Sequence, residues 1–530
     1  MRLSDHDLTQ LNTSYLDTLP EDNLRSLSKK LLEDLKEARE RLNRTPETSS
    51  LPPSSREPWK SADTKETPRT TEAIVVDEHT VEPGEPGTAE TQDSPTPPNT
   101  PETANSEIIP TTKKRGKPGR CKGSQGYSRE LTLDVTRIQP HYPADCTGCC
   151  QTFKADTIFR AWTGHYELEI NVGHASQPGI VIEHILHRYY EADCSCGHGT
   201  RAEPGRCADE PEWSVALTEW HLCGPNLVGL IVCMALQLRV SRRKIKEFLK
   251  DWLHIDLSTT TINQCVHEAG RAISPVVTEQ LIPELLASDL LHIDETAWKE
   301  AGKLVWLWAF VSTYTVVYQI GKRHRLVVQH LLGNLFKGFI MTDGFSVYRI
   351  FPKRLRCWAH LIRKARALHQ SLDVDAQEFG GNLLLVLTLL MRNLYQLRED
   401  PGDAEVLRER NQQLLELLRK LCEIHQTSER EDCRKLAHEF LNDWEAIVRV
   451  VETPTHPLTN NTAERSLRHW VILRKVTFGS RHEQGSRVVA LLASVIGSAR
   501  LRQVNPWSFI AQAVANRRRN LAVPLLPMLA

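Results

Sequence analysis

The sequence predicts a multidomain protein built around a mixed α/β core. Three observations favour this class. The chain has 530 residues, which is too long for one compact hydrophobic core. Residues 286–374 alternate short β-branched and aromatic segments with a helical one. Residues 375–450 are then Leu-rich and helical in pattern, and they separate this core from a last set of helices in residues 451–530.

The charge of the chain is balanced in total but unevenly distributed. The 66 Lys and Arg equal the 66 Asp and Glu. Residues 1–110 hold 12 basic against 22 acidic residues, and subtracting them leaves 54 basic against 44 acidic in the rest of the chain. A basic body is typical of a protein with a polyanionic partner. Zero net charge therefore does not exclude DNA binding.

The sequence gives no sign of secretion or of a membrane partner. The N-terminal residues lack the apolar run of a signal peptide, and no stretch of 18 or more apolar residues appears. We expect a soluble, cytoplasmic protein. In that reducing compartment, close pairs among the 13 cysteines are expected to bind metal rather than form disulfides.

The first segment, residues 1–44, is expected to hold one amphipathic helix over residues 21–43. Apolar residues recur near a heptad spacing at Leu24, Leu31, Leu35, Ala38 and Leu42. This spacing predicts a coiled-coil helix that joins copies of the chain into a homo-oligomer. A helix that packs on its own protein is the alternative.

Residues 45–112 are rich in Pro, Thr, Ser and Glu with few aromatics, which predicts a disordered linker. The character changes to basic in residues 113–130, a Gly- and Pro-punctuated arm. Its candidate DNA-binding residues are Lys113, Lys114, Arg115 and Lys117. Such an extended arm neutralises phosphates or lies in a minor groove. A solvated linker is the alternative.

Close cysteine pairs mark the next segment, residues 131–215. The candidate ligands are Cys146, Cys149, Cys194 and Cys196. The pairs flank residues 165–172 and 179–190, which are expected to form a hairpin. Four thiolates across a hairpin are the ligand set of a structural Zn²⁺ site. Cys150 or His198 is an alternative ligand, and buried free thiols are the alternative to a metal site.

Residues 216–285 are expected to be helical and to bind DNA. Arg242, Arg243 and Lys244 open a helix over residues 241–252, and Ser258 is placed to N-cap the next helix. A helix, a polar turn and a second helix fit a helix-turn-helix DNA reader. Plain helix packing is the alternative.

The core segment, residues 286–374, carries two of the candidate catalytic residues. Strands are expected at residues 291–294, 305–312, 315–320 and 338–342, with a helix at 326–335 before the last of them. Three strands, a helix and a fourth strand are the opening of a ribonuclease-H-like fold. There the first and fourth strands lie side by side, so Asp294 and Asp343, expected at the strand ends, would face each other.

A third carboxylate follows the helical insertion of residues 375–450. Glu464 is expected in the first turns of a helix capped by Asn460 or Asn461, which packs on the sheet. Three carboxylates are suited to two Mg²⁺ or Mn²⁺ ions and to phosphoryl transfer on nucleic acid. Taken singly, the aspartates are ordinary loop residues and Glu464 is a surface partner of Arg465 and Arg468.

Several motifs occur together in the order of one known family. They are His292-Ile293-Asp294-Glu295-Thr296, Thr342-Asp343-Gly344, Cys357-Trp358-Ala359-His360 and Asn460-Asn461-x-Ala463-Glu464-Arg465-x-Leu467-Arg468, after the leucine-rich helix, the basic run and the cysteine knuckle. With these motifs the chain resembles the DDE transposases of insertion sequence 66, the TnpC type, over nearly its whole length. The resemblance implies that Asp294, Asp343 and Glu464 are the metal-binding catalytic triad.

The same resemblance bears on the basic residues near the triad. In DDE enzymes with a Cys-x-x-His signature, the position of His360 implies a contact with the scissile phosphate or a role in orienting a ligand. A packed, structural cysteine and histidine are the alternative, and zinc is disfavoured because no second ligand pair is near in sequence. Arg465 and Arg468 are candidates for phosphate contacts around the active site.

We therefore expect the DNA transposase of a bacterial insertion sequence, associated with the nucleoid. It would bind terminal inverted repeats and target DNA and catalyse metal-dependent cleavage and strand transfer. Accessory proteins encoded by the same element are possible further partners. Two alternatives remain open: a DNA-binding regulator whose ribonuclease-H-like domain is only a scaffold, and a nuclease of the same fold without strand transfer.

Overall fold

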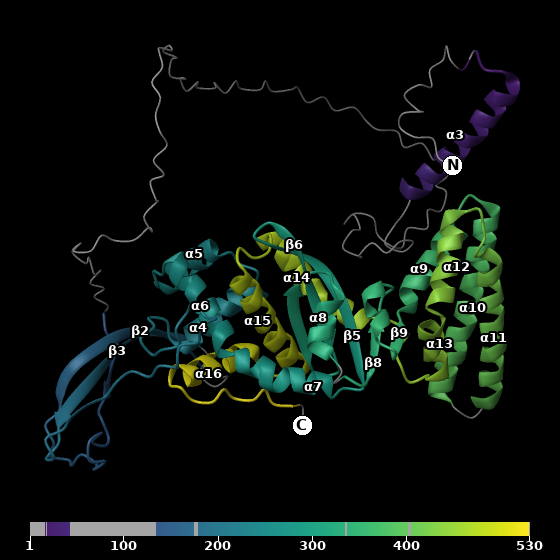
Figure 1. The fold of residues 1–530 in the computed structure, drawn as a ribbon. Coiled ribbons are helices and arrows are strands. Elements are labelled where there is room, and N and C mark those ends of the chain that lie inside the picture. Colours follow the sequence, from purple (N-terminus) through teal and green to yellow (C-terminus); the bar gives the residue numbers. More distant parts are fainter. Residues whose placement is uncertain are drawn as a thin grey trace, which may run out of the picture. The chain divides into compact units, whose positions relative to one another are not determined.

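The computed structural model describes residues 16, 18–42, 134–173, 179–333, 336–400 and 404–528. They form a mixed α/β structure with two separate sheets and helices at the C-terminus (Figure 1). The expected linker of residues 45–112 and the basic arm of residues 113–130 lie outside the described residues. The same holds for the arm's candidate residues, Lys113, Lys114, Arg115 and Lys117.

Helix α3 (Glu21–Leu42) is the helix expected near the N-terminus. Leu24, Leu31 and Leu35 are exposed on it. A row of exposed leucines at this spacing is what a helix needs to pair with a second helix. Homo-oligomer formation through α3 stays a prediction.

The first sheet has four strands and contains the expected hairpin. Its strands are β1 (Arg137–His141), β2 (Arg160–Val172), β3 (Ile180–Asp193) and β4 (Gly199–Arg201). β2 and β3 pair antiparallel, β1 pairs parallel with β3, and β4 extends the far end of β3. Both hairpin strands are longer than expected, because the pairing of β2 with β3 continues to Arg160 and Glu191, and β3 then pairs with β4 up to Asp193.

A helical segment connects the two sheets. It consists of α4 (Pro225–Val232), the π-helical turn η2 (Cys233–Gln237), α5 (Arg242–Leu253), α6 (Thr259–Ala272), a second π-helical turn η3 (Val276–Leu281) and α7 (Ile282–Leu286). Ser258 caps α6 as expected, since its side chain accepts from the Thr261 N–H at 3.0 Å. Ser241 caps α5 in the same way through the Lys244 N–H.

The second sheet has five strands in the order β7-β6-β5-β8-β9. They are β5 (Leu290–Glu300), β6 (Lys303–Val311), β7 (Val316–Gly321), β8 (Phe339–Thr342) and β9 (Arg354–Arg356). The first three strands pair antiparallel as a meander. Helix α8 (Arg325–Leu332) then crosses over to β8, which pairs parallel with β5 and with β9. The first and fourth strands of this segment therefore lie side by side, as expected.

One expectation about this sheet is wrong: Asp294 does not end its strand. β5 runs on to Glu300, and Asp294 is paired with Ala309 of β6. Only the pairing with β8 stops early, at His292 and Met341. The apolar run does end at Asp294, but the antiparallel partner β6 continues the strand beyond it.

Two C-terminal helices cover the second sheet. α14 (Asn461–Thr477) packs on β5 and β6, and α15 (Glu483–Leu501) packs on the edge strand β7. Ser494 and Ser498 of α15 bond the backbone of β7 at Tyr318 and Val316. These hydroxyl groups satisfy backbone groups of the strand edge that no further strand pairs.

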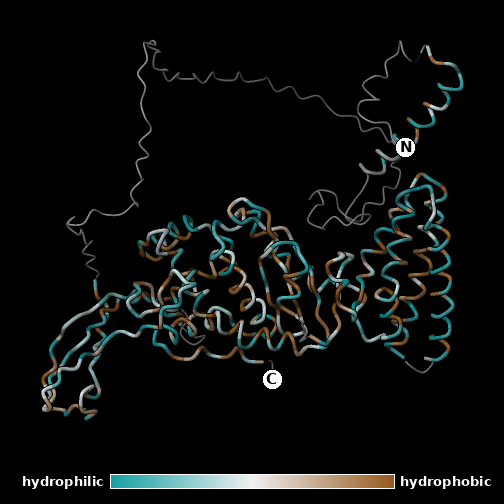
Figure 2. The backbone as a smooth tube through the Cα atoms, in the orientation of Figure 1, coloured by the Kyte–Doolittle hydropathy of each residue, from teal (hydrophilic) through white to brown (hydrophobic). Residues whose placement is uncertain are grey.

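The expected helical insertion is present. It consists of α10 (Val374–Glu399), α11 (Ala404–His425), α12 (Glu431–Asn442) and α13 (Trp444–Glu452), which pack with α9 (Trp358–His369) of the preceding segment around a second apolar core (Figures 1 and 2). α10 is long and apolar enough to cross a membrane by length and composition alone. Its residues Phe379, Leu383, Leu387 and Leu390 are fully buried in that core, which accounts for their apolar character.

The last helix, α16 (Pro506–Arg518), packs against α4 and α6. Arg518 at its end is buried and donates to both carboxylate oxygens of Glu268, at 2.7 and 2.9 Å. A buried, bidentate pair of this kind fixes the position of two helices, because removing one partner leaves an uncompensated charge.

Two glycines with positive φ give a test of how tightly the end of β5 is held. Gly479 (φ +95°) lies on the loop after α14, where an added Cβ would overlap the Lys299 carbonyl oxygen, whereas Gly302 (φ +79°) has open space. We expect Gly302→Ala to cost about 1–2 kcal/mol from backbone strain alone. Gly479→Ala should add about 1–3 kcal/mol of steric overlap, measured by urea unfolding. Equal losses in the two variants would contradict this packing.

Candidate active site

The register of the sheet places the two aspartates next to each other. Asp294 lies two residues beyond His292, and Asp343 lies two residues beyond Met341, which pairs with His292. Because side chains alternate between the faces of a sheet, an equal offset of two residues puts both carboxylates on the same face. Strand pairing thus brings together two residues that are far apart in the sequence.

Each aspartate is fixed by a local backbone hydrogen bond. Asp294 Oδ1 accepts from the Glu295 N–H at 2.9 Å. Asp343 Oδ1 accepts from the Phe345 N–H at 2.9 Å, so its side chain closes the turn that follows β8. The next residue, Gly344, has no room for a side chain, because the Arg356 guanidinium packs directly against it.

Glu464 completes the cluster from α14. It lies in the first turn of that helix and is half-buried. The pKa of Asp294 is raised well above its ordinary value by burial, then by Asp343, Glu295 and Glu464. The structure therefore brings Asp343 and Glu464 close enough to Asp294 for their negative charges to raise its pKa.

A network that the sequence reasoning missed holds the turn at Asp343. Glu295 accepts from the Arg323 guanidinium at 2.8 and 3.0 Å and from the Tyr348 hydroxyl at 2.6 Å. The same guanidinium lies over the rings of Trp306 and Phe345, at 4.3 and 3.9 Å. The one available signal was the second carboxylate in Asp294-Glu295, which points to the opposite face of β5 from Asp294.

His360, expected near the active site, contacts Glu464. Its Nε2 is 3.9 Å from Glu464 Oε1, and Arg363 Nη2 is 3.8 Å from the same oxygen. The donor atoms of Cys357, His360 and Glu464 all lie within 4.8 Å of one another. Burial, followed by the positive charge of Arg363, lowers the pKa of His360 to about 4, so the imidazole is neutral at neutral pH.

The cluster of Cys357, His360 and Glu464 has the donor atoms for a metal ion, but the positive charge around His360 favours a phosphate. Lys364 and Arg356 also lower the pKa of His360. A positive potential attracts a phosphate and repels a metal cation. Cys357 is fully buried and its Sγ accepts from the Asn460 N–H at 3.2 Å, which is a structural use of the thiol.

The insertion holds the basic residues beside the active site. Glu439 of α12 accepts from Arg356 and from Lys364. Asp443, which follows α12, lies 3.0 Å from Arg354, 3.2 Å from Arg349 and 3.7 Å from Arg356. The buried Arg356 therefore joins two acidic residues of the insertion to Gly344 in the loop of Asp343.

The other candidate DNA-binding residues differ in exposure. Arg465 and Arg468 are exposed on α14, the helix that carries Glu464. On α5, Arg243 and Lys244 are exposed and pair with Glu247 of the same helix. Arg242 is instead half-buried and bonds Asn263 of α6 at 3.5 Å. Arg243 and Lys244 are thus the better placed of the three to meet DNA.

The four expected zinc ligands converge at the end of the hairpin. The Sγ atoms of Cys146 and Cys196 are 3.7 Å apart, and those of Cys149 and Cys194 are 3.6 Å apart. All four lie within 4.8 Å of one another. A tetrahedral Zn²⁺ with bonds of about 2.3 Å requires a sulfur separation of about 3.8 Å. The geometry is therefore compatible with zinc.

Neither alternative ligand belongs to this group. Cys150 is exposed, and His198 Nε2 bonds the Thr147 hydroxyl at 2.9 Å. The backbone N–H of Cys149 is the main cause that lowers the pKa of Cys146 to about 6. Backbone N–H groups that stabilise a thiolate in this way are expected of a metal-binding knuckle.

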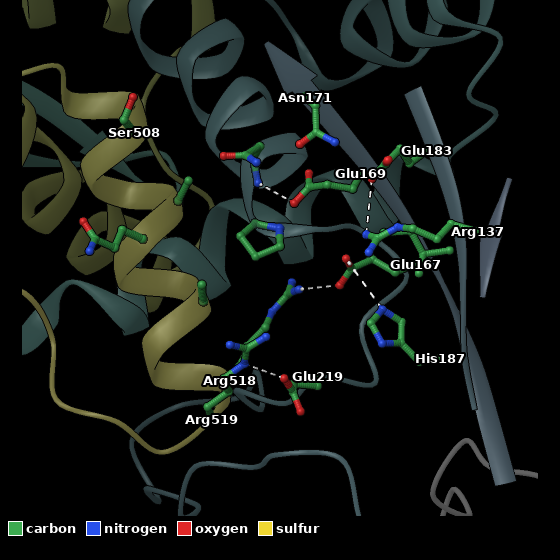
Figure 3. Close-up of a pocket in the computed structure, with 16 residues that line it drawn as sticks. Arg137, Glu167, Glu169, Asn171, Glu183, His187, Glu219, Ser508, Arg518 and Arg519 are labelled. Carbon is green, nitrogen blue, oxygen red and sulfur yellow. Dashed lines mark hydrogen bonds and ion pairs between the residues drawn. The ribbon is translucent and has the colours of Figure 1, made fainter. Parts of the chain in front are cut away.

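A cavity of about 420 Å³ lies elsewhere, between the hairpin and α16 (Figure 3). None of the triad residues lines it. Its buried carboxylate, Glu169, accepts from the backbone N–H groups of Ile170, Asn226 and Leu227 and so caps α4. Arg518, which also lines the cavity, is bound to Glu268. Glu169 therefore joins the hairpin to α4, and Arg518 joins α16 to α6.

The second sheet, the insertion and α14 lie in a region that matches a known family of transposases. The match is to the family model described as "Transposase IS66 family" and spans residues 221–488, which is 268 of the 530 residues. The chain belongs to the IS66 family of transposases. The matched region includes the triad, His360 and the helix-turn-helix candidate, but neither the cysteine cluster nor α3.

Two similar proteins come from Sinorhizobium fredii (strain NBRC 101917 / NGR234), and both are named as uncharacterized. The protein y4qI is 25% identical over 293 residues, which cover 49% of this chain and 53% of y4qI. The protein y4jD is 25% identical over 199 residues, which cover 34% of this chain and 37% of y4jD. The chain thus spans about half the length of the first relative and less of the second.

Repulsion in the triad predicts that Asp294→Asn stabilises the metal-free protein. A carboxylate whose pKa is raised on folding destabilises the native state at every pH above its unfolded pKa. At pH 7.5 in EDTA, the variant should gain about 0.5–2 kcal/mol in thermal or urea unfolding. The gain should fade as the pH falls toward the ordinary aspartate value of 3.8.

Asp443→Asn is the control, because Asp443 is a buried carboxylate that is paired with arginines instead of with other carboxylates. That variant should lose stability under the same conditions. A loss in Asp294→Asn as well would contradict the close approach of the three carboxylates.

The cysteine geometry predicts one Zn²⁺ per chain. Cys149→Ser should abolish stoichiometric zinc in the purified protein, measured by elemental analysis, because it removes one of the four converging thiolates. Cys150→Ser, one residue away, should keep it. Equal zinc content in both variants would show that the four sulfurs do not form the site.

Proposed function

We propose that this protein is the DNA transposase of a bacterial insertion sequence. It would bind the terminal inverted repeats of its element, cleave the DNA and join the ends to target DNA. The convergence of Asp294, Asp343 and Glu464 carries this proposal. The strand order, with a three-stranded meander, a crossover helix and a parallel fourth strand, supports a ribonuclease-H-like core.

The donor set fits divalent cations of the Mg²⁺ or Mn²⁺ type. Three carboxylates supply hard oxygen ligands, and their mutual repulsion at a buried position is relieved by positive charge. Asp294, Asp343 and Glu464 would hold two such ions. When bound, the ions would activate an attacking water or 3′-hydroxyl and stabilise the leaving oxygen.

The chain's own residues would orient the phosphate. His360 is neutral and lies in a positive potential from Arg363 and Lys364. Its side chain is partly exposed beside Glu464, and the neutral imidazole can supply an N–H donor to a phosphate oxygen. Arg465 and Arg468, exposed on the helix of Glu464, are placed for the flanking phosphates.

Other parts of the chain would recognise and assemble the DNA. The helices α5 and α6, with Arg243 and Lys244, would read the element ends as a helix-turn-helix. The Cys146–Cys196 group would hold a structural Zn²⁺ that stabilises the end of the hairpin. Helix α3 would join two copies, so that both ends of the element are held together, in the cytoplasm at the nucleoid. Accessory proteins of the same element would be further partners.

Metal-dependent joining of labelled element-end DNA tests the proposal. We expect Asp294→Asn, Asp343→Asn and Glu464→Gln each to reduce cleavage and strand transfer to background, while DNA binding is retained, because each removes an ion ligand. The nearby Glu439→Gln, outside the triad, should retain measurable activity.

The same assay separates the alternatives. Cleavage without joining would favour a nuclease of the same fold. DNA binding without any cleavage by the wild type, with accessory proteins supplied, would favour a DNA-binding regulator.

A further inference from the structure

Asn460, the residue before α14, uses both polar groups of its side chain to bond β5. It is buried, with 1% of its surface exposed. Its Nδ2 donates to the Ile293 carbonyl oxygen at 2.8 Å, and its Oδ1 lies 3.1 Å from His292 Nδ1. Because a carbonyl only accepts, the amide orientation is fixed, and His292 must carry its proton on Nδ1.

This use of the side chain is unusual for its position. Asn460 is the N-cap residue of α14, where an asparagine normally accepts from an N–H of the helix. No such cap bond is formed. The amide instead bonds the two residues that directly precede Asp294, so the helix forgoes a stabilising interaction in favour of a contact with the strand.

The backbone of Asn460 bonds two further parts of the site, at the start of α9 and in the first turn of α14. Its N–H donates to Cys357 Sγ at 3.2 Å, directly after β9. Its carbonyl accepts from the Glu464 N–H at 3.2 Å, in the first turn of α14. One residue therefore contacts the strand of Asp294, the start of α9 and the residue Glu464 itself.

The strand order shows how the bonds of Asn460 relate to the strands that carry Asp294 and Asp343. β8, which leads into Asp343, lies between β5 and β9 in the sheet. Asn460 is bonded to β5 on one side and to the residue after β9 on the other. The Ile293 carbonyl that it binds lies one residue beyond the last pair of β5 with β8. The Asn460 amide thus ties α14 to the sheet where the strands that carry the two aspartates separate.

We propose that Asn460 is a positioning residue that sets the place of Glu464 relative to Asp294 and Asp343. This inference rests on the proposed function, because it assigns Asn460 to the same carboxylate site. An amide is required at this position, since it alone supplies one donor to Ile293 and one acceptor to His292. An aspartate of the same shape would place a second acceptor against the Ile293 carbonyl.

The sequence provides a matched control in the next residue. Asn461 has the same side chain but is exposed at the start of α14. If the asparagines acted only through helix propensity or local polarity, the two positions would respond alike. If Asn460 acts through β5, only its substitution will disturb the carboxylates.

Binding of Mn²⁺ to the zinc-loaded full-length protein, followed by the paramagnetic resonance signal of free Mn²⁺, tests the proposal without DNA or turnover. We expect Asn460→Ala and Asn460→Asp to weaken Mn²⁺ binding by about 10- to 100-fold, the range for residues that orient metal ligands. Asn461→Ala should stay within about twofold of the wild type.

A second control separates positioning from loss of stability. Leu390→Ala removes a buried side chain from the core of the insertion and lowers stability without touching the carboxylates. It should leave Mn²⁺ affinity unchanged. Wild-type affinity in Asn460→Ala, or an equal loss in Leu390→Ala, would overturn the proposal. A different outcome would count against the carboxylate site itself. If the wild type binds no Mn²⁺, or if Asp294→Asn does not abolish the binding, the proposed function loses its support.

Discussion

The repulsion between neighbouring, half-buried carboxylates is the constraint around which this structure is organised. Strand pairing puts Asp294 and Asp343 on the same face of adjacent strands, and α14 adds Glu464. Burial and like charge raise the pKa of Asp294. Such an arrangement persists only when the surrounding structure holds it in place. Three separate sets of contacts do so: the bonds of Glu295 to Arg323 and Tyr348, the packing of Arg356 against Gly344, and the bonds of Asn460 to β5 and Cys357.

The helical insertion takes part in this support. Its acidic residues Glu439 and Asp443 bind basic side chains of β9 and α9. The buried Arg356 pairs with both of them and packs against Gly344 in the loop of Asp343. The insertion also separates Asp343 from Glu464 along the chain, while the segment before Glu464 returns to the sheet: the Leu458 carbonyl accepts from the Trp358 N–H. The insertion therefore has a structural reason to lie at this point in the sequence.

Much of the fold was predictable from local patterns. β-Branched and aromatic residues predicted the hairpin β2–β3 and the strands β5 to β8, and Ser258 predicted the start of α6, because these signals depend on neighbouring residues. The short strands β1, β4 and β9 were not predicted, since they form only by pairing with longer strands. The end of β5 was not predictable, since the strand continues past Asp294 only through its pairing with β6. The expected linker and basic arm lie outside the described residues, and the domain boundaries remain predictions.

The candidate site was predictable in its residues but not in its support. The motif order pointed to the three carboxylates and to the four cysteines, which the structure brings together. The Asn460-Asn461 pair gave no sign of which asparagine faces the strand, because that depends on the direction from which α14 approaches the sheet. The contacts of Arg323 with Glu295 and Phe345 join residues with no shared sequence pattern.

The central claim is that Asp294, Asp343 and Glu464 form one site for divalent cations. Crystals of the full-length protein soaked in Mn²⁺, with anomalous scattering recorded at the manganese edge, would test it most directly. The account predicts anomalous peaks within coordination distance of all three carboxylates. Peaks elsewhere, with none between these side chains, would contradict it.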